Sequence, residues 1–164
     1  MIARYTRPEM GRIFSDENRF AQWLEVELAA SEALAETGEV PADAARALRQ
    51  HAAFEVARIH EIERETKHDV IAFTTAVAEK MAAANAANAS RWLHYGLTSN
   101  DVVDTAQALV LKQASALLRK GTESLLESLK RRAFEFQHTP QIGCTHGIHA
   151  EPITFGLKRS EEHT

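Results

Sequence analysis

The densest group of chemically active side chains lies in residues 143–152, which read Gly-Cys-Thr-His-Gly-Ile-His-Ala-Glu-Pro. Histidine exchanges a proton near neutral pH, so His146 and His149 are candidates for general acid–base chemistry. Pro140 and Pro152 flank the stretch and two glycines lie inside it, which excludes the middle of a regular helix. We therefore expect a polar loop between helices, because loops on a rigid scaffold commonly carry function.

Two other interpretations of this stretch stay open. It could be a structural turn whose histidines are hydrogen-bonded. It could also be a metal site, since Cys144, His146, His149 and Glu151 are acceptable zinc ligands by type. The metal interpretation is the least favoured, because Gly147 makes the helical pitch of a His-x-x-His pair doubtful and no second cluster has metal spacing.

Three further groups carry polar side chains that could bind or turn over a substrate. They are Arg4 and Tyr5 near the N-terminus, Lys67, His68 and Asp69 between two expected helices, and His94, Thr98 and Ser99 before a long helix. Taken singly, each group has an ordinary explanation: a mobile terminus, a helix cap, or a partly buried core histidine. Only their combination favours a functional interpretation.

Composition limits the class of protein. The chain has 164 residues, 45% hydrophobic and 26% charged, which suits a globular domain rather than a disordered one. A net charge of −4 gives no reason to expect nucleic-acid binding. No apolar run approaches the roughly 20 residues of a membrane span, and the first residues lack a signal-peptide core. Cys144 is the single cysteine, so no intrachain disulfide can form, and we expect a cytoplasmic protein without a membrane partner.

Apolar periodicity and capping residues predict an almost entirely helical, all-α chain. Asp16 is expected to cap a helix that Gly38 ends, Pro41 to open a second helix through residue 48, and a third helix to span about 54–65. Asp69 should cap a fourth helix. Residues 82–90 are rich in Ala and Asn and aperiodic, so we expect a frayed helix end or a surface insertion there.

The long helix is the strongest structural signal. Thr98-Ser99-Asn100-Asp101 marks its start, and no proline intervenes before about His138. Its apolar residues cover more than one stripe, so several neighbouring helices must bury it. The chain offers too few partners after it. We therefore expect part of a larger bundle, completed by further chain, other subunits or both. A last helix should begin near Thr154.

These ordered motifs resemble the aspartase/fumarase superfamily, and within it the adenylosuccinate lyase family. The residues that carry the resemblance lie at 4–10, 23–27, 67–73, 94–106 and 145–156, with a small insertion near 83–89. The strings Tyr-Gly-Leu-Thr-Ser and Thr-His-Gly-x-His-Ala-Glu favour this family over argininosuccinate lyase, aspartase or fumarase.

The resemblance implies a reaction and roles for these residues. Members of the family cleave a C–N bond by β-elimination, releasing fumarate from adenylosuccinate and from the succinyl-carboxamide ribotide of purine synthesis. His146 then corresponds to the general acid and His68 to its companion, with Lys67 and Asp69 beside it. Thr98 and Ser99 correspond to binders of the succinyl carboxylate, Arg4 and Tyr5 to phosphate contacts, and His94 to a supporting residue. No metal or organic cofactor is implied, and the family is homotetrameric.

Two departures and a tail qualify the resemblance. Cys144 stands where the family usually carries arginine, and the family's serine loop, Ser-Ser-x-Met-Pro-x-Lys-x-Asn-Pro, is not found in the sequence. We therefore expect an N-terminal fragment that is itself inactive.

The expected domain organisation follows from the same resemblance. A first helical domain should cover residues 1–97, and residues 98–158 should form the start of the bundle. Residues 159–164 change character abruptly and are interpreted as a non-native tail. The alternatives are another lyase of the superfamily or a non-catalytic helical assembly module.

Overall fold

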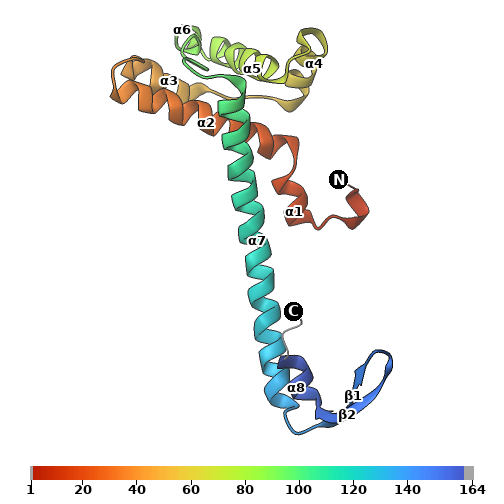
Figure 1. The fold of residues 1–164 in the computed structure, drawn as a ribbon. Coiled ribbons are helices and arrows are strands. Elements are labelled where there is room, and N and C mark those ends of the chain that lie inside the picture. The colour runs from red at the N-terminus through yellow and green to blue at the C-terminus, as the bar shows by residue number, and fades with distance from the viewer. Residues whose placement is uncertain (1, 161–164) are drawn as a thin grey trace. The chain divides into compact units, whose positions relative to one another are not determined.

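A computed structural model describes residues 2–160, and Figure 1 labels its helices and strands. The chain forms two compact units, unit 1 up to Ala114 and unit 2 from Ser115 onward. Unit 1 holds a 3-10 helix and seven α-helices, the last of which continues into unit 2. They are Ala3–Tyr5, α1 (Pro8–Ile13), α2 (Asp16–Glu36), α3 (Ala42–His51), α4 (Val56–Thr66), α5 (Asp69–Ala83), α6 (Ala87–Ser90) and α7 (Ser99–Glu135). Unit 2 adds β1 (Pro140–Thr145), β2 (Ile148–Thr154) and α8 (Phe155–Ser160). The predicted all-α class is confirmed, apart from this small sheet.

An aromatic cluster between α2 and α5 forms the centre of unit 1. Phe20 and Phe73 are fully buried and stack with ring centroids 5.8 Å apart, while Trp23 meets Phe73 edge-on at 5.5 Å. Burying each such ring contributes about 2 kcal/mol. The start of α7 joins the same core through Val102 and Ala106, so the residues before α7 are held on a rigid base.

Two predicted caps were wrong by one residue. The N-cap of α2 is Ser15, whose Oγ accepts a hydrogen bond from the Asn18 amide, and Asp16 is the first helical residue. Likewise, His68 rather than Asp69 caps α5. In both cases the carboxylate lies in the first turn, where the helix dipole favours negative charge, so it stabilises the helix without capping it.

The expected frayed end at residues 82–90 is an ordered turn. Helix α5 ends at Ala83, Asn85 adopts a left-handed φ of 58°, and the short α6 follows. Ala89 is buried in the core, so this segment is not a mere surface insertion. The sequence gives no apolar periodicity here, because a buried alanine differs little in hydrophobicity from the exposed alanines around it.

The expected loop at 140–152 is a β-hairpin, which is the main correction to the sequence-based fold. The strands β1 and β2 are antiparallel, with Cys144 opposite His149 and Thr145 opposite Ile148. The register shifts between Ile142 and Cys144, where Gly143 lies opposite Ala150 and Glu151, as in a β-bulge. A Cβ at Gly143 would lie 2.9 Å from the Glu151 carbonyl oxygen, which explains why this position needs glycine.

Helix α8 returns against the C-terminal end of α7 within unit 2. The amides of Phe155 and Gly156 donate to the carbonyls of Thr139 and Phe136 at 2.8 and 2.9 Å. Helix α8 includes residues 159–160 of the predicted tail, while 161–164 lie outside the described residues. Among residues 2–160, no helix has the length and apolar character needed to cross a membrane.

Candidate active site

His146 occupies the tip of the hairpin. His146 and Gly147 both have left-handed backbones, with φ of 49° and 76°, and together form a two-residue turn. Left-handed φ is uncommon for residues other than glycine, although histidine is among the more tolerant. The His146 side chain is exposed and forms no hydrogen bond or ion pair within residues 115–160. The turn therefore presents the imidazole without engaging either ring nitrogen.

His149 differs from His146 in that it has a neighbour across the strands. Its Nδ1 lies 4.0 Å from the Cys144 Sγ, at the outer limit of a sulfur hydrogen bond. The thiol of Cys144 is therefore the nearest partner of the His149 ring across the two strands. Among the described residues, no group of three or more His, Cys, Asp or Glu side chains could hold a metal ion.

His68 lies at the junction of α4 and α5. Lys67 ends α4 with a left-handed φ of 54°, and His68 Nδ1 accepts a hydrogen bond from the Ile71 amide at 3.3 Å. Because Nδ1 acts as the acceptor, the ring proton belongs on Nε2, which faces no partner among residues 2–114. Asp69 Oδ1 is 3.6 Å from Nδ1 and accepts from the Val70 amide instead. The cap thus fixes the ring and leaves Nε2 without a hydrogen-bond partner among residues 2–114.

His94 has the most constrained setting of the predicted site residues. Its backbone is left-handed, with φ of 62°, and its amide donates to Glu27 Oε2 at 2.8 Å. The same carboxylate approaches His94 Nδ1 through Oε1 at 2.6 Å. Glu27 is fully buried in α2. Sequence reasoning missed Glu27, although an acidic residue four positions after Trp23, on the buried face of α2, was a signal for it.

Thr98 and Ser99 open α7. The Thr98 amide donates to Asp101 Oδ2 at 2.8 Å, so Asp101 satisfies one donor of the helix start. Neither hydroxyl forms a hydrogen bond among residues 2–114. Helix N-termini present free amides and a positive dipole end, which suits an anionic group.

Arg4 and Tyr5 lie in the short 3-10 helix near the N-terminus. Both side chains are exposed, and the Arg4 guanidinium lies 4.8 Å from the centre of the Tyr5 ring. Within unit 1, no hydrogen bond or ion pair among the described residues joins His68 to His94 or Thr98. Any convergence of these groups on one substrate stays a prediction.

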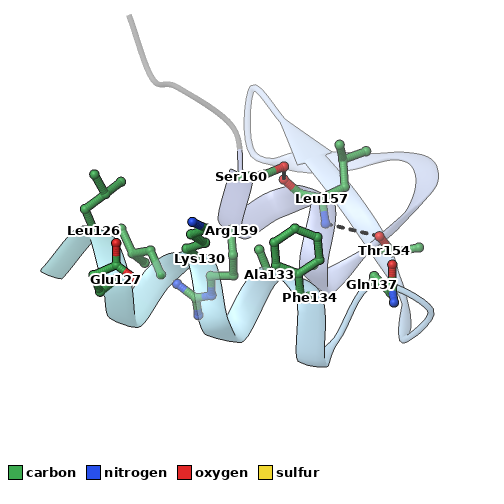
Figure 2. Close-up of a pocket in the computed structure, with 12 residues that line it drawn as sticks. Leu126, Glu127, Lys130, Ala133, Phe134, Gln137, Thr154, Leu157, Arg159 and Ser160 are labelled. Atoms are coloured by element: carbon green, nitrogen blue, oxygen red, sulfur yellow. Dashed lines mark hydrogen bonds between the residues drawn. The ribbon is translucent and has the colours of Figure 1, made fainter. Parts of the chain in front are cut away.

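A groove in unit 2 lies apart from the predicted site residues. It has a volume of about 710 Å³, and Figure 2 shows that side chains of α7 and α8 line it, including Leu126, Phe134 and Leu157. None of the predicted site residues lines it.

Comparison with known proteins decides the family. A family model described as "Lyase" matches residues 3–163. The chain belongs to the lyase family. The predicted relationship to aspartase/fumarase-type lyases is thereby confirmed.

Relatives within the lyase family narrow the resemblance. The chain is 51% identical over 158 residues to adenylosuccinate lyase of Bacillus subtilis (strain 168), covering 96% of this chain and 36% of that protein. It is 49% identical to adenylosuccinate lyase of Streptococcus mutans, covering 96% and 35%. The chain thus spans about a third of the length of the curated relatives it matches.

A solved structure shares the fold of the chain. The 3-carboxy-cis,cis-muconate lactonizing enzyme from Pseudomonas putida superposes with a TM-score of 0.85 at 30% identity, covering 96% of this chain and 36% of that one. The likeness extends over both units of the chain. It confirms the predicted lyase-type helical architecture.

Proposed function

We propose that the complete protein is an adenylosuccinate lyase that acts in purine nucleotide biosynthesis. The observation that carries the proposal is the 51% identity over 158 residues with an adenylosuccinate lyase. In the proposed reaction a base removes the proton on the carbon beside a carboxylate, and the C–N bond then breaks. A general acid protonates the departing nitrogen, giving fumarate and AMP. The succinyl-carboxamide ribotide would be cleaved in the same way.

His146 is the proposed general acid. Its exposed ring at the hairpin tip supports this role, because an acid must reach the leaving nitrogen with a ring nitrogen that no other group engages. His68 is its proposed companion, and its fixed ring with a free Nε2 supports that assignment. Lys67 and Asp69 flank His68 and are proposed to bind substrate.

The remaining predicted residues are proposed to bind the anionic ends of the substrate. Thr98 and Ser99 offer hydroxyls at the start of α7 for the succinyl carboxylate, whose charge grows in the transition state. Arg4 offers paired guanidinium donors and Tyr5 a hydroxyl for the phosphate. His94 supports the site. The chemistry uses side chains alone and needs no metal or organic cofactor.

The architecture of the complete protein is part of the same proposal. Residues 1–97 form the N-terminal helical domain, and residues 98–158 begin the central bundle. The base is a serine on a loop outside these 164 residues. We place the assembled homotetramer in the cytoplasm. The exposed leucines of α7 support a bundle that further helices complete.

The test is substrate discrimination by the protein expressed from its complete reading frame. Absorbance would follow cleavage of adenylosuccinate, and separate assays would follow cleavage of argininosuccinate and hydration of fumarate. Of these three compounds, only adenylosuccinate is expected to react. Preference for another substrate would make the protein a different lyase of the superfamily, and no nucleotide binding at all would indicate a non-catalytic helical module.

A further inference from the structure

Glu27 is a charged residue in a place where charge is expensive. It is fully buried, on the α2 face that also carries Phe20 and Trp23. An ionised carboxylate removed from water costs several kcal/mol unless hydrogen bonds and charge compensate it. Its contacts must therefore explain why the position holds an acid.

Those contacts converge on one residue. Both carboxylate oxygens of Glu27 are used by His94, Oε2 by the backbone amide and Oε1 by the ring Nδ1. The left-handed φ of His94 accompanies this geometry, in which amide and ring of one residue meet the same carboxylate. A purely structural anchor for the connector, which is the segment 91–98 between α6 and α7, would need only the hydrogen bond from the His94 amide.

The second bond has a chemical consequence. A carboxylate only accepts hydrogen bonds, so Nδ1 of His94 must carry a proton. Nε2 is then the ring nitrogen left for a ligand, and the ring cannot rotate without losing its partner. The side chain of His94 remains about a quarter exposed, so the ring is accessible.

We propose that Glu27 is a positioning residue that fixes the orientation and tautomer of His94, so that Nε2 is presented to the substrate. The inference rests on the proposed function, in which His94 supports the active site. Glu27 itself, being buried, does not touch the substrate.

The experiment is a double-mutant cycle in the protein expressed from its complete reading frame. Glu27→Gln keeps the shape but replaces one acceptor oxygen by an NH2 donor, so it can satisfy both the amide and Nδ1 of His94 only if the ring proton moves from Nδ1 to Nε2. We expect kcat/KM for adenylosuccinate to fall on the order of 10-fold to 100-fold. In a His94→Asn background, Glu27→Gln should change kcat/KM by less than about twofold, because the partner ring is gone. Asn tolerates the left-handed backbone at this position.

A matched control lies one turn along α2. Ser31 is also buried, and its Oγ donates to the Trp92 carbonyl of the same connector at 3.4 Å. Ser31→Ala should therefore test anchoring of the connector without touching His94, and should leave kcat/KM nearly unchanged. If Glu27→Gln lowered kcat/KM equally in the wild-type and the His94→Asn backgrounds, the proposal would be overturned. Normal activity of His94→Asn would overturn it as well.

A second measurement does not depend on activity. Ring-15N histidine labelling and solid-state NMR, with His94 assigned by its loss in His94→Asn, should show a proton on Nδ1 that becomes mixed between the two nitrogens in Glu27→Gln. A His94 ring protonated on Nε2 alone would refute the inference even in an active enzyme. If the proposed function is wrong, the wild-type protein will not cleave adenylosuccinate, and that result is distinct from the NMR result on His94.

Discussion

At the residue scale, the hairpin distinguishes two histidines that the sequence leaves similar. His146 adopts a left-handed backbone at the turn, with an exposed and unengaged ring, whereas His149 lies within a strand opposite Cys144. Backbone conformations of this kind are sparsely populated and often accompany functional positions. The geometry therefore favours His146 for proton transfer and His149 for a supporting role.

Replacing each histidine by glutamine in the complete protein tests this assignment of roles. His146→Gln should lower kcat on the order of 10²-fold to 10⁴-fold with a smaller effect on substrate affinity, because the proton is needed chiefly in the transition state. His149→Gln should cost less. Steady-state kinetics and metal content would be measured for both variants. A near-normal kcat for His146→Gln refutes the acid role, while joint loss of metal and activity would support the zinc interpretation instead.

At the element scale, the short α8 depends on backbone contact with α7. A Cβ at Gly156 would lie 2.3 Å from the Ala133 carbonyl oxygen and 2.6 Å from the Gln137 Cα. Neither neighbour can move without disturbing the end of α7. Only glycine at this position therefore lets α8 pack against the end of α7. Because β2 leads directly into α8, the same contact also positions the second strand of the hairpin.

Paired glycine-to-alanine substitutions should have opposite effects on the stability of the chain. Gly156→Ala should destabilise unit 2 by about 1–3 kcal/mol through overpacking. Gly121 lies inside α7 with nothing within 4 Å of a new Cβ, so Gly121→Ala should stabilise the helix by roughly 0.5–1 kcal/mol. Hydrogen exchange of the amides in α7 and α8 measures both changes in stability. Unchanged protection in Gly156→Ala would contradict the close contact.

Helices α2 and α3 are joined by an ion-pair network. Arg49 donates to Glu25 and Glu32 at distances down to 2.7 Å, and the hydrogen bond from Arg49 lowers the pKa of Glu32 below its usual 4.5. The network is half-exposed, so water screens much of its strength. It links the helix that carries Glu27 to its neighbour.

This network predicts a pH-dependent stability difference. Arg49→Gln should reduce the free energy of unfolding by about 0.5–1 kcal/mol at pH 7. Because the folded-state pKa of Glu32 is depressed, its contribution is present above pH 4.5 and disappears as pH falls through the lower folded value. Wild type and variant should therefore converge in acid, as denaturant titrations at several pH values would show. Arg46→Gln is the control, since Arg46 forms no ion pair among residues 2–160. A difference that persists unchanged in acid would contradict the assignment.

The sequence predicts helices well here and misses the sheet, for a physical reason. Helices bury one face, so Phe20, Trp23 and Phe73 leave a periodic pattern. Both strands of the hairpin are mostly exposed, so no apolar alternation marks them. The remaining signal was His146-Gly147, a pair able to adopt two left-handed conformations between strand-forming residues. The candidate site followed from motif resemblance, but Glu27 needed coordinates, because its significance lies in a contact across 67 positions.

At the scale of the whole molecule, the chain holds only part of the proposed machinery. It spans 36% of the Bacillus subtilis relative, and the Ser-Ser-x-Met-Pro-x-Lys-x-Asn-Pro motif, on which the proposed base would lie, is not found in its 164 residues. A β-elimination without its base loses much of its acceleration. The residues proposed to act as general acid and to bind the anionic ends of the substrate lie within the chain, whereas the proposed base does not.

The 164 residues alone should therefore give no turnover of adenylosuccinate. Absorbance would follow release of fumarate, with the protein from the complete reading frame as the positive control. Activity at typical enzymatic rates, roughly 1 per second or more, would contradict the proposed source of the base.

The same chain should self-associate through the exposed apolar side chains of α7. Leu118, Leu125 and Leu126 are 62%, 58% and 61% exposed, and the first two lie seven residues apart, on one side of the helix. Apolar surface of this extent marks an interface or an aggregation site. Sedimentation velocity should show oligomers that grow with concentration, and a hydrophobic dye should bind. Replacing Leu118 and Leu125 by lysine should shift the chain toward monomer, whereas Lys120→Glu, at an exposed polar position, should not. A monomeric wild-type chain that binds no dye would contradict the bundle interpretation, because the leucines would then need no partner.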